Sequence, residues 1–302
     1  MTRRKFVYCC LGASGVAASY PCYFEPRWLA VTHHQVDLQR APLPDPIRIL
    51  HLSDLHFSAF VPLSLIESAV TLGLAQKPDV ICLTGDFITD REELGAGPYS
   101  RVLSRLSRSA PTFAVLGNHD GGIWAQVSGG YSDHRAVAKL LDQSGIELLH
   151  NRATRVQVRN SVLSLVGVGD LWSDEIEAAR AFSGLDLRLP IVLLSHNPDS
   201  KDPLGNDPWD LMLSGHTHGG QVILPFQGPR YAPVLDKRYV AGLRPWGSRQ
   251  IHVTRGVGSL GGIRFGCRPE VSILVVGGNR IEAENLSGSS RFPADRFASR
   301  IL

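Results

Sequence analysis

Two histidines stand two positions apart in a glycine-rich segment, LSGHTHGGQ, at residues 213–221. His216 and His218 could bind a metal ion, form an acid/base couple, or lie in a solvated loop. The segment follows a short apolar run, so the pair comes at the end of a predicted strand. Which chemistry the pair performs depends on what other side chains reach the same place.

Four other apolar runs also end in side chains that could bind a metal ion. IRILHLSDLH ends in Asp54 and His56, VICLTGD in Asp86, and FAVLGNHD in Asn118, His119 and Asp120, while IVLLSHNPD contains His196. Ligand sites of open α/β sheets collect at the carboxyl ends of the strands. Glycines before Asp86, Asn118 and His216 let the backbone turn sharply there. Each fragment alone could be a cap or a solvated loop, but together they predict a single site.

The order D-x-H, GD, GNHD, H and GHTH resembles that of the calcineurin-like metallophosphoesterase superfamily, and it spans residues 54–218. Within that superfamily, GHTHGGQ and the later RGVGSLGGIRFGCRPE resemble the YaeI/YkuE-type branch of bacterial phosphodiesterases. The resemblance implies an α/β fold of four layers, an αββα sandwich in which two mixed β-sheets are flanked by helices.

The resemblance also implies a binuclear metal site with two divalent metal ions. One ion would be held by Asp54, His56, Asp86 and His218, and the other by Asp86, Asn118, His196 and His216. Asp86 would bridge the two ions. Mixed imidazole, carboxylate and amide ligands favour Mn, Fe, Zn or Co over Ca or Mg. Such a pair clamps the attacking and leaving oxygens of an in-line displacement, with metal-bound hydroxide as the nucleophile.

Three further positions follow from the resemblance or lie near the site. The family histidine that matches His119 contacts the phosphate and helps to protonate the leaving oxygen, a role that suits imidazole. Asp120 is expected either to orient His119 or only to cap a turn. Arg255 or Arg264, in the glycine-rich loop after residue 254, could contact a phosphate, or the loop is purely structural.

Competing motifs are weak. Residues 256–261 read G-x-G-x-x-G, but no helical pattern follows them, and the next residues contain further glycines and Pro269, which argues against a nucleotide cofactor. Without a G-x-S-x-G segment, a serine hydrolase is also poorly supported. The histidines outside the motifs are expected to be structural or solvated, and these are His33, His34, His51, His134, His150 and His252.

Short apolar runs alternate with helical patterns, which predicts the α/β class. Strands are expected at residues 28–38, 47–53, 80–84, 113–116, 161–168, 191–195, 211–213, 251–254 and 271–276. Helices are expected at residues 63–74, 101–106, 134–144 and 174–182. So many strands in one chain predict two sheets packed face to face in a single catalytic domain, residues 24–302.

The first residues predict a targeting segment, residues 1–23. Arg3 and Arg4 precede an apolar stretch at residues 6–20 that falls short of the ~20 apolar residues needed to cross a bilayer. The pattern resembles a twin-arginine export signal. We therefore expect export across the cytoplasmic membrane or attachment to its outer face. The alternative is a basic amphipathic segment that attaches the chain to the cytoplasmic membrane surface.

Composition and charge limit the possible partners. The chain has 302 residues, of which 43% are hydrophobic and 20% charged, as in an ordinary globular protein with a sizeable core. A net charge of +3, with several positive charges in the first few residues and no Lys/Arg run beyond them, indicates no nucleic acid partner. Five scattered cysteines predict neither a disulfide framework nor a zinc ribbon. No protein partner is predicted.

The resemblance therefore predicts a metal-dependent phosphodiesterase acting on a phosphodiester or pyrophosphate. Some relatives of this branch hydrolyse the pyrophosphate of UDP-2,3-diacylglucosamine in lipid A biosynthesis, so a lipid-linked substrate is the alternative. That nucleotide is cytosolic, so export would count against it and a membrane-surface segment would favour it. A scaffold protein with a silent site is disfavoured, because the chain keeps every ligand position.

Overall fold

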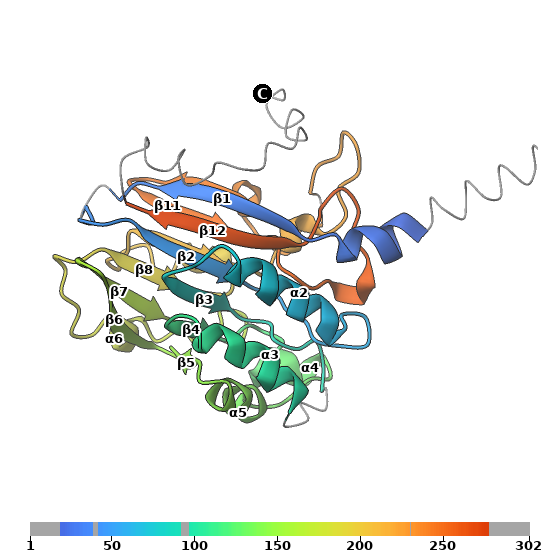
Figure 1. Ribbon diagram of the computed structural model, residues 1–302. Coiled ribbons are helices and arrows are strands. Elements are labelled where there is room, and N and C mark those ends of the chain that lie inside the picture. Colours follow the sequence, from blue (N-terminus) through green and yellow to red (C-terminus); the bar gives the residue numbers. More distant parts are fainter. Residues whose placement is uncertain (1–18, 39–41, 92–96, 230, 278–302) are drawn as a thin grey trace, which may run out of the picture.

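The computed structural model describes residues 19–38, 42–91, 97–229 and 231–277, which form two six-stranded sheets packed face to face (Figure 1). The first sheet has the order β1 (Ala30–Val36), β12 (Glu270–Val276), β2 (Ile47–Leu52), β3 (Val80–Thr84), β4 (Thr112–Val115) and β5 (Glu147–Leu148). The second has the order β10 (Gly242–Trp246), β11 (Arg249–Val253), β9 (Leu211–Ser214), β8 (Ile191–Leu194), β7 (Ser161–Gly167) and β6 (Arg152–Val158). Each sheet contains parallel and antiparallel pairs, so both are mixed.

Helices cover the outer face of the first sheet, where α2 (Leu63–Leu74), α3 (Pro98–Ser107) and α5 (Arg135–Gln143) lie side by side (Figure 1). The short α4 (Gly122–Val127) follows β4, and α6 (Ala178–Ala181) packs on the second sheet. The remaining turns are η1 (Tyr20–Phe24), η2 (Glu25–Arg27), η3 (Pro198–Lys201), η4 (His218–Gly220), η5 (Lys237–Tyr239) and η6 (Leu260–Gly262). The predicted αββα arrangement is confirmed, with a thin fourth layer over the second sheet.

Alternate residues of a strand face opposite layers, and the inner strands are apolar on both faces for this reason. In β2, Ile49 lies in the core between the two sheets, whereas Leu50 lies in the core under α2 and α3. Leu165 and Leu213 of the second sheet meet Ile49 in the same inter-sheet core. The parallel strands β2, β3 and β4 of the first sheet and β8 and β9 of the second bring their carboxyl ends to one edge of the sandwich, whereas β12 runs antiparallel to β2.

The strands that sequence patterns did not reveal are edge strands. β5, β6 and β10 each end a sheet, and their sequences, such as RATRVQV and GLRPW, carry charged residues or proline. Edge strands avoid further pairing by such residues, so they lack the apolar run of an inner strand. The predicted helix at residues 174–182 is wrong in length. Within this range only α6 is helical, because Asp174 has a φ of 57° and Glu177 has φ −109° and ψ 75°, both outside the helical region.

The last residues of the predicted targeting segment and the residues that follow it pack against the domain. The Arg264 N–H donates to the Pro21 carbonyl at 2.8 Å, and the Cys267 N–H donates to Glu25 Oε1 at 2.6 Å. Residues 1–18, which make up most of the predicted targeting segment, lie outside the described residues. None of the helices in the described ranges has the length and apolar character needed to cross a membrane.

Candidate metal centre

Seven candidate ligands converge where five inner strands end. The loops after β2 and β3 carry Asp54, His56 and Asp86, the loop after β4 carries Asn118, and the loops after β8 and β9 carry His196, His216 and His218. All seven side chains are buried. The structure therefore brings together residues that are up to 164 positions apart in the chain (218 − 54).

Two groups of potential ligands lie side by side at this edge, and a third group, of His56, Asp86 and His119, overlaps both. Asp54, His56 and His218 have ligand atoms within 4.8 Å of one another, as do Asp86, His196 and His216. In the first group, His56 Nε2 is 3.1 Å from His218 Nε2, and His218 Nε2 is 3.5 Å from Asp54 Oδ1.

Asp86 connects the two groups through one oxygen. Its Oδ2 lies 3.3 Å from His56 Nε2 and 3.1 Å from His196 Nε2. A carboxylate between histidines of both groups is placed as a bridging ligand would be.

Buried polar atoms at the site test whether a cation fits. Asn118 Oδ1 and His216 Nε2 are buried, and neither makes a hydrogen bond within the described part of the chain. Buried polar atoms are normally paired, so such atoms need an explanation. Carbonyl oxygen and neutral imidazole nitrogen both have lone pairs that a divalent cation accepts, and the residues present therefore fit a metal site.

Electrostatics of the protein alone also favour a cation here. Burial disfavours the protonated ring of His196, but the Asp86 carboxylate and, more weakly, Asp54 and Asp170 outweigh this effect and raise the pKa of His196 to about 10. Burial, together with repulsion from His196, lowers the pKa of His216 to about 3. The carboxylates thus stabilise positive charge beside Asp86, and a metal ion would supply it.

Most of the ligand backbones adopt an unusual conformation. The φ angles are 53° at Asp54, 47° at His56, 55° at Asp86, 68° at His216 and 51° at His218. Residues other than glycine rarely adopt this left-handed region, because each instance costs about 1–3 kcal/mol and persists only where the surrounding structure enforces it. Such residues concentrate at functional sites, so the strain marks this edge independently of residue type.

Two glycines are required here by close packing. A β-carbon on Gly117 would lie 2.2 Å from Asp86 Oδ1, and one on Gly215 would lie 2.2 Å from Asp54 Oδ2. Any side chain at these positions would displace a candidate ligand. The glycines before the ligands therefore leave room for the two carboxylates.

His119 lies beside the two groups. Its ring is partly exposed, 4.9 Å from the His56 ring, and its Nδ1 is 2.7 Å from the Thr89 carbonyl oxygen. The His119 main-chain N–H donates to Asp86 Oδ1 at 3.0 Å. The residue is therefore fixed next to the bridging carboxylate.

Asp120 does not orient His119. Its Oδ2 accepts the N–H groups of Asp86 and Gly117, each at 2.8 Å, and its Oδ1 accepts that of Phe87 at 2.7 Å. Burial and the charge of Asp86 raise the pKa of Asp120 to about 7. Of the two expectations, the turn cap is the one that fits, because Asp120 joins the turns after β3 and β4.

The expected phosphate contact by Arg264 does not hold. The side chain is fully buried, and its guanidinium donates to main-chain carbonyls, including those of Arg255 at 2.7 Å and His218 at 3.3 Å. Arg264 therefore shapes the backbone beneath the site. The partly exposed Arg255 donates from Nε to Glu270 Oε2 at 3.2 Å.

Two tryptophans beside the site were missed by sequence analysis. The Trp124 ring centroid is 4.6 Å from that of His119, and the Trp172 ring centroid is 4.2 Å from that of His216. The two indoles are 5.7 Å apart, and Trp172 is 41% exposed. No sequence spacing relates them, because they follow β4 and β7 of different sheets. They form an apolar wall on one side of the ligands.

Comparison with known proteins agrees with this geometry. The family model described as calcineurin-like phosphoesterase matches residues 47–220, which include all seven candidate ligands. The chain is 44% identical over 276 residues to phosphodiesterase YaeI of Escherichia coli strain K12, covering 91% of this chain and 98% of that protein. It is 31% identical over 291 residues to the uncharacterized metallophosphoesterase YkuE of Bacillus subtilis strain 168, with the same coverage of 91% and 98%.

A more distant relative has a named substrate. UDP-2,3-diacylglucosamine pyrophosphatase LpxG of Chlamydia muridarum is 27% identical over 278 residues, which cover 76% of this chain and 83% of that protein. The family match and the 44% identity to a phosphodiesterase support a phosphoric ester hydrolase. The chain belongs to the calcineurin-like phosphoesterase family.

Proposed function

We propose that the chain hydrolyses a phosphodiester with two divalent metal ions. The observation that carries this proposal is the place of Asp86 Oδ2 between His56 and His196, one histidine from each ligand group. When bound, the ions would supply Lewis acidity and an activated water.

Each ion would have its own set of side chains. Asp54, His56 and His218 would hold one ion, Asn118, His196 and His216 the other, and Asp86 would contact both. Imidazole, carboxylate and amide donors together favour Mn, Fe, Zn or Co. The histidines must bind as neutral rings, so metal binding would displace the proton that the carboxylates stabilise on His196.

His119 would donate a proton to the leaving oxygen. Its Nδ1 is held by the Thr89 carbonyl, and the ring is partly exposed beside the ligands. A histidine in this place is available to a substrate and is not needed as a ligand. Proton donation in the transition state is typically worth 10²–10⁴-fold in rate.

Trp124 and Trp172 support an organic group on the phosphate. Indoles bind apolar or flat groups and contribute little to binding inorganic phosphate. Their place beside His119 and His216 favours a diester whose substituent contacts the indoles. The similarity to phosphodiesterase YaeI points to the same substrate class.

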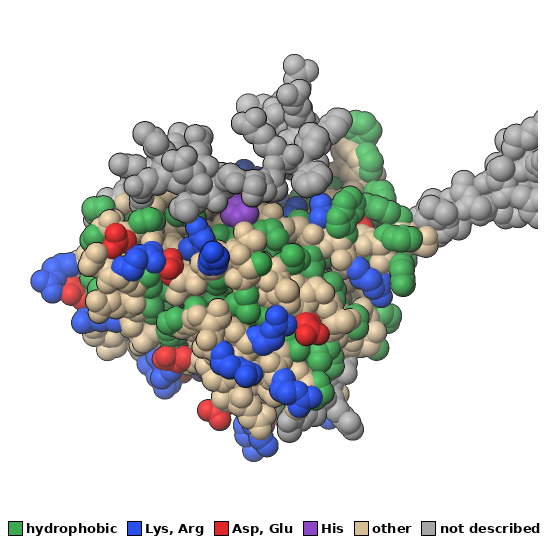
Figure 2. Space-filling model, in the orientation of Figure 1, with side chains coloured by type: hydrophobic (Ala, Val, Ile, Leu, Met, Phe, Trp, Pro, Cys, Tyr) green, Lys and Arg blue, Asp and Glu red, His purple; other side chains and the backbone are tan. Residues whose placement is uncertain are grey.

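The second candidate is hydrolysis of the pyrophosphate of UDP-2,3-diacylglucosamine. It is supported by the similarity to LpxG and by the aromatic residues that follow residue 18. Tyr23 is 60% exposed, Phe24 56% and Trp28 56%, and hydrophobic side chains gather at that end of the molecule (Figure 2). Exposed aromatic side chains next to Arg27 suit a membrane interface, where a lipid-linked substrate would lie.

We also propose that Arg3 and Arg4 direct export, so that the chain works beyond the cytoplasmic membrane or on its outer face. Attachment to the cytoplasmic surface is the alternative, and it would give access to a cytosolic nucleotide. The two locations therefore separate the two candidate substrates.

One assay with two substrates tests the proposed function. The purified full chain, loaded with Mn²⁺, Co²⁺ or Zn²⁺, would be given bis-p-nitrophenyl phosphate and UDP-2,3-diacylglucosamine. We expect metal-dependent hydrolysis of the first, and its loss in His196→Ala but not in His33→Ala, whose ring contacts Gln76 away from the site. Activity confined to the second substrate would favour the alternative, and equal activity without metal would reject both.

A further inference from the structure

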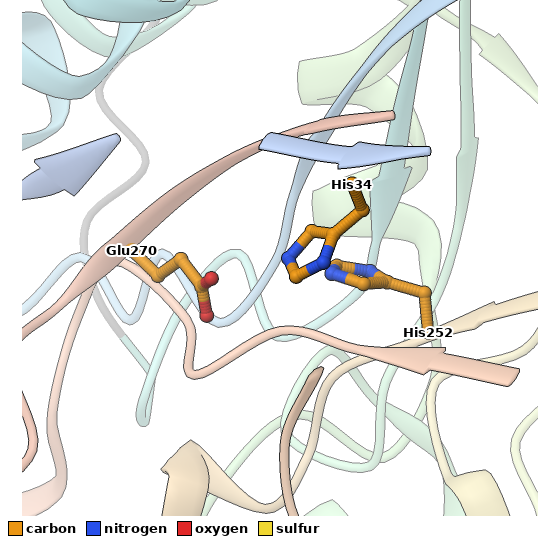
Figure 3. Close-up of side chains that lie close together, drawn as sticks. All are labelled: His34, His252 and Glu270. Carbon is orange, nitrogen blue, oxygen red and sulfur yellow. The ribbon is translucent and has the colours of Figure 1, made fainter. Parts of the chain in front are cut away.

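A second cluster of metal-binding side chains lies between the two sheets, apart from the candidate metal centre. His34 lies on β1, Glu270 begins β12, and His252 lies on β11 of the opposite sheet. Their ligand atoms are within 4.8 Å of one another. Figure 3 shows the Glu270 carboxylate and the two rings pointing toward a common space.

Two nitrogens in this cluster have no hydrogen-bond partner. His252 is fully buried, and its Nε2 makes no hydrogen bond within the described part of the chain; the same holds for His34 Nε2. Leaving a buried polar group unpaired destabilises the fold, because the group loses its hydrogen bonds to water. A buried imidazole nitrogen facing a carboxylate and a second imidazole therefore needs a partner.

The other ring nitrogen of His252, Nδ1, makes a hydrogen bond of the kind that metal-binding histidines make. His252 Nδ1 is 3.0 Å from His51 Nδ1, and His51 Nε2 is 2.8 Å from Thr84 Oγ1. If His51 donates from Nε2 to Thr84, its Nδ1 accepts the Nδ1–H of His252, and His252 Nε2 is left with a free lone pair. Histidines that bind metal commonly donate their second N–H to a neighbouring acceptor in this way.

His51 and His252 are both fully buried. Burial lowers the pKa of His51 to about 3, and burial followed by the charges of the neighbouring histidines lowers the pKa of His252 well below its usual value.

Glu270 is an anchored carboxylate. Its Oε1 accepts the Thr32 hydroxyl at 2.5 Å, and its Oε2 accepts the Arg255 main-chain N–H at 2.8 Å. Burial alone would raise the pKa of Glu270, but its hydrogen bonds and nearby positive charges outweigh burial and lower it. The side chain thus presents a negative charge to the two histidines.

We propose that His34, His252 and Glu270 bind a zinc ion that joins the two sheets. Two imidazoles and one carboxylate form a known zinc ligand set, with a fourth position left for water. In a tetrahedral site with bonds of 2.0–2.1 Å the ligand atoms lie about 3.4 Å apart, so small side-chain rotations complete the geometry. His34 is only partly buried and gives the ion a way in.

The test counts bound zinc in a chain that lacks the bridging ligand of the other centre. Asp86→Ala is combined with His34→Ala, with Glu270→Gln, or with His33→Ala. His33 is the matched control, because it is the neighbour of His34 on β1, is exposed, and bonds Gln76 instead. After dialysis against Zn²⁺, we expect the His34 and Glu270 variants to hold one zinc ion fewer per chain than the His33 variant.

A second measurement guards against a variant that merely misfolds. Zn²⁺ should raise the thermal unfolding midpoint of Asp86→Ala/His33→Ala but not that of Asp86→Ala/His34→Ala. Equal zinc content and equal stabilisation in the two proteins would overturn the proposal. The comparison does not depend on the proposed function, because zinc left at the other centre contributes equally to both proteins.

Discussion

His119 Nδ1 lies 2.7 Å from the main-chain oxygen of Thr89. A carbonyl only accepts hydrogen bonds, so Nδ1 must carry a proton and Nε2 is the ring atom left to exchange one with a substrate. The Thr89 carbonyl thus holds the Nδ1 proton and leaves Nε2 as the nitrogen that donates when the ring is protonated.

We expect His119→Ala to keep its metal content and lose activity. On a diester with a poor leaving group, kcat should fall by about 10²–10⁴-fold, because the leaving oxygen then departs without a proton. On bis-p-nitrophenyl phosphate the loss of activity should be much smaller, because p-nitrophenolate is a good leaving group that hardly needs protonation. Steady-state kinetics on the two diesters, with metal analysis, checks this. Equal losses on both would leave His119 as a phosphate contact only.

Trp172→Ala should weaken substrate binding more than turnover. An aromatic contact is worth about 0.5–1.5 kcal/mol, so KM for bis-p-nitrophenyl phosphate should rise roughly 2–12-fold with little change in kcat. Leu187→Ala is the control, because Leu187 is also exposed but precedes β8, at the opposite edge of the sheet from the ligands. A KM unchanged by Trp172→Ala would remove the indole from the substrate site.

Gly117→Ala should damage the metal centre while leaving the fold intact. The added β-carbon would lie 2.2 Å from Asp86 Oδ1, so the carboxylate must move away. Metal affinity should therefore fall at least tenfold, as measured by titration, with an unchanged far-UV circular dichroism spectrum. Gly97→Ala is the control, since its added carbon meets only the flexible end of Arg101. Wild-type metal affinity in Gly117→Ala would show that the turn yields without moving Asp86.

The sequence predicted the inner strands and the candidate ligands for one physical reason. Buried inner strands must be apolar, so a polar residue at the carboxyl end, such as Asp86 after β3, stands out. The same pattern could not find β6 or β10, because edge strands need not be apolar.

Sequence patterns could not predict the residues whose role depends on tertiary packing. Arg264 was one of two arginines expected to contact a phosphate, but it is buried and donates to main-chain carbonyls of several turns. Trp124 and Trp172 meet only because the two sheets pack together. His252 belongs to no sequence motif, and its neighbours on the opposite sheet also meet it only because the two sheets pack together.

Changing Arg3 and Arg4 together to lysine should retain the chain in the cytoplasm. A twin-arginine signal depends on the arginine pair, and lysine preserves the charge while removing the guanidinium groups. Cell fractionation followed by immunoblotting measures the distribution. A distribution identical to that of the wild type would reject export by this route and favour attachment at the cytoplasmic surface.

The most direct test of the binuclear centre compares Asp86→Ala with His218→Ala by counting metal ions per chain. Asp86 contacts histidines of both groups, whereas His218 belongs to one. We expect Asp86→Ala to lose both ions of the centre and His218→Ala to lose occupancy of one. Both counts would be taken in the His34→Ala background, so that no zinc bound between the sheets is included. Two ions per chain in Asp86→Ala/His34→Ala would contradict the bridging role on which the account rests.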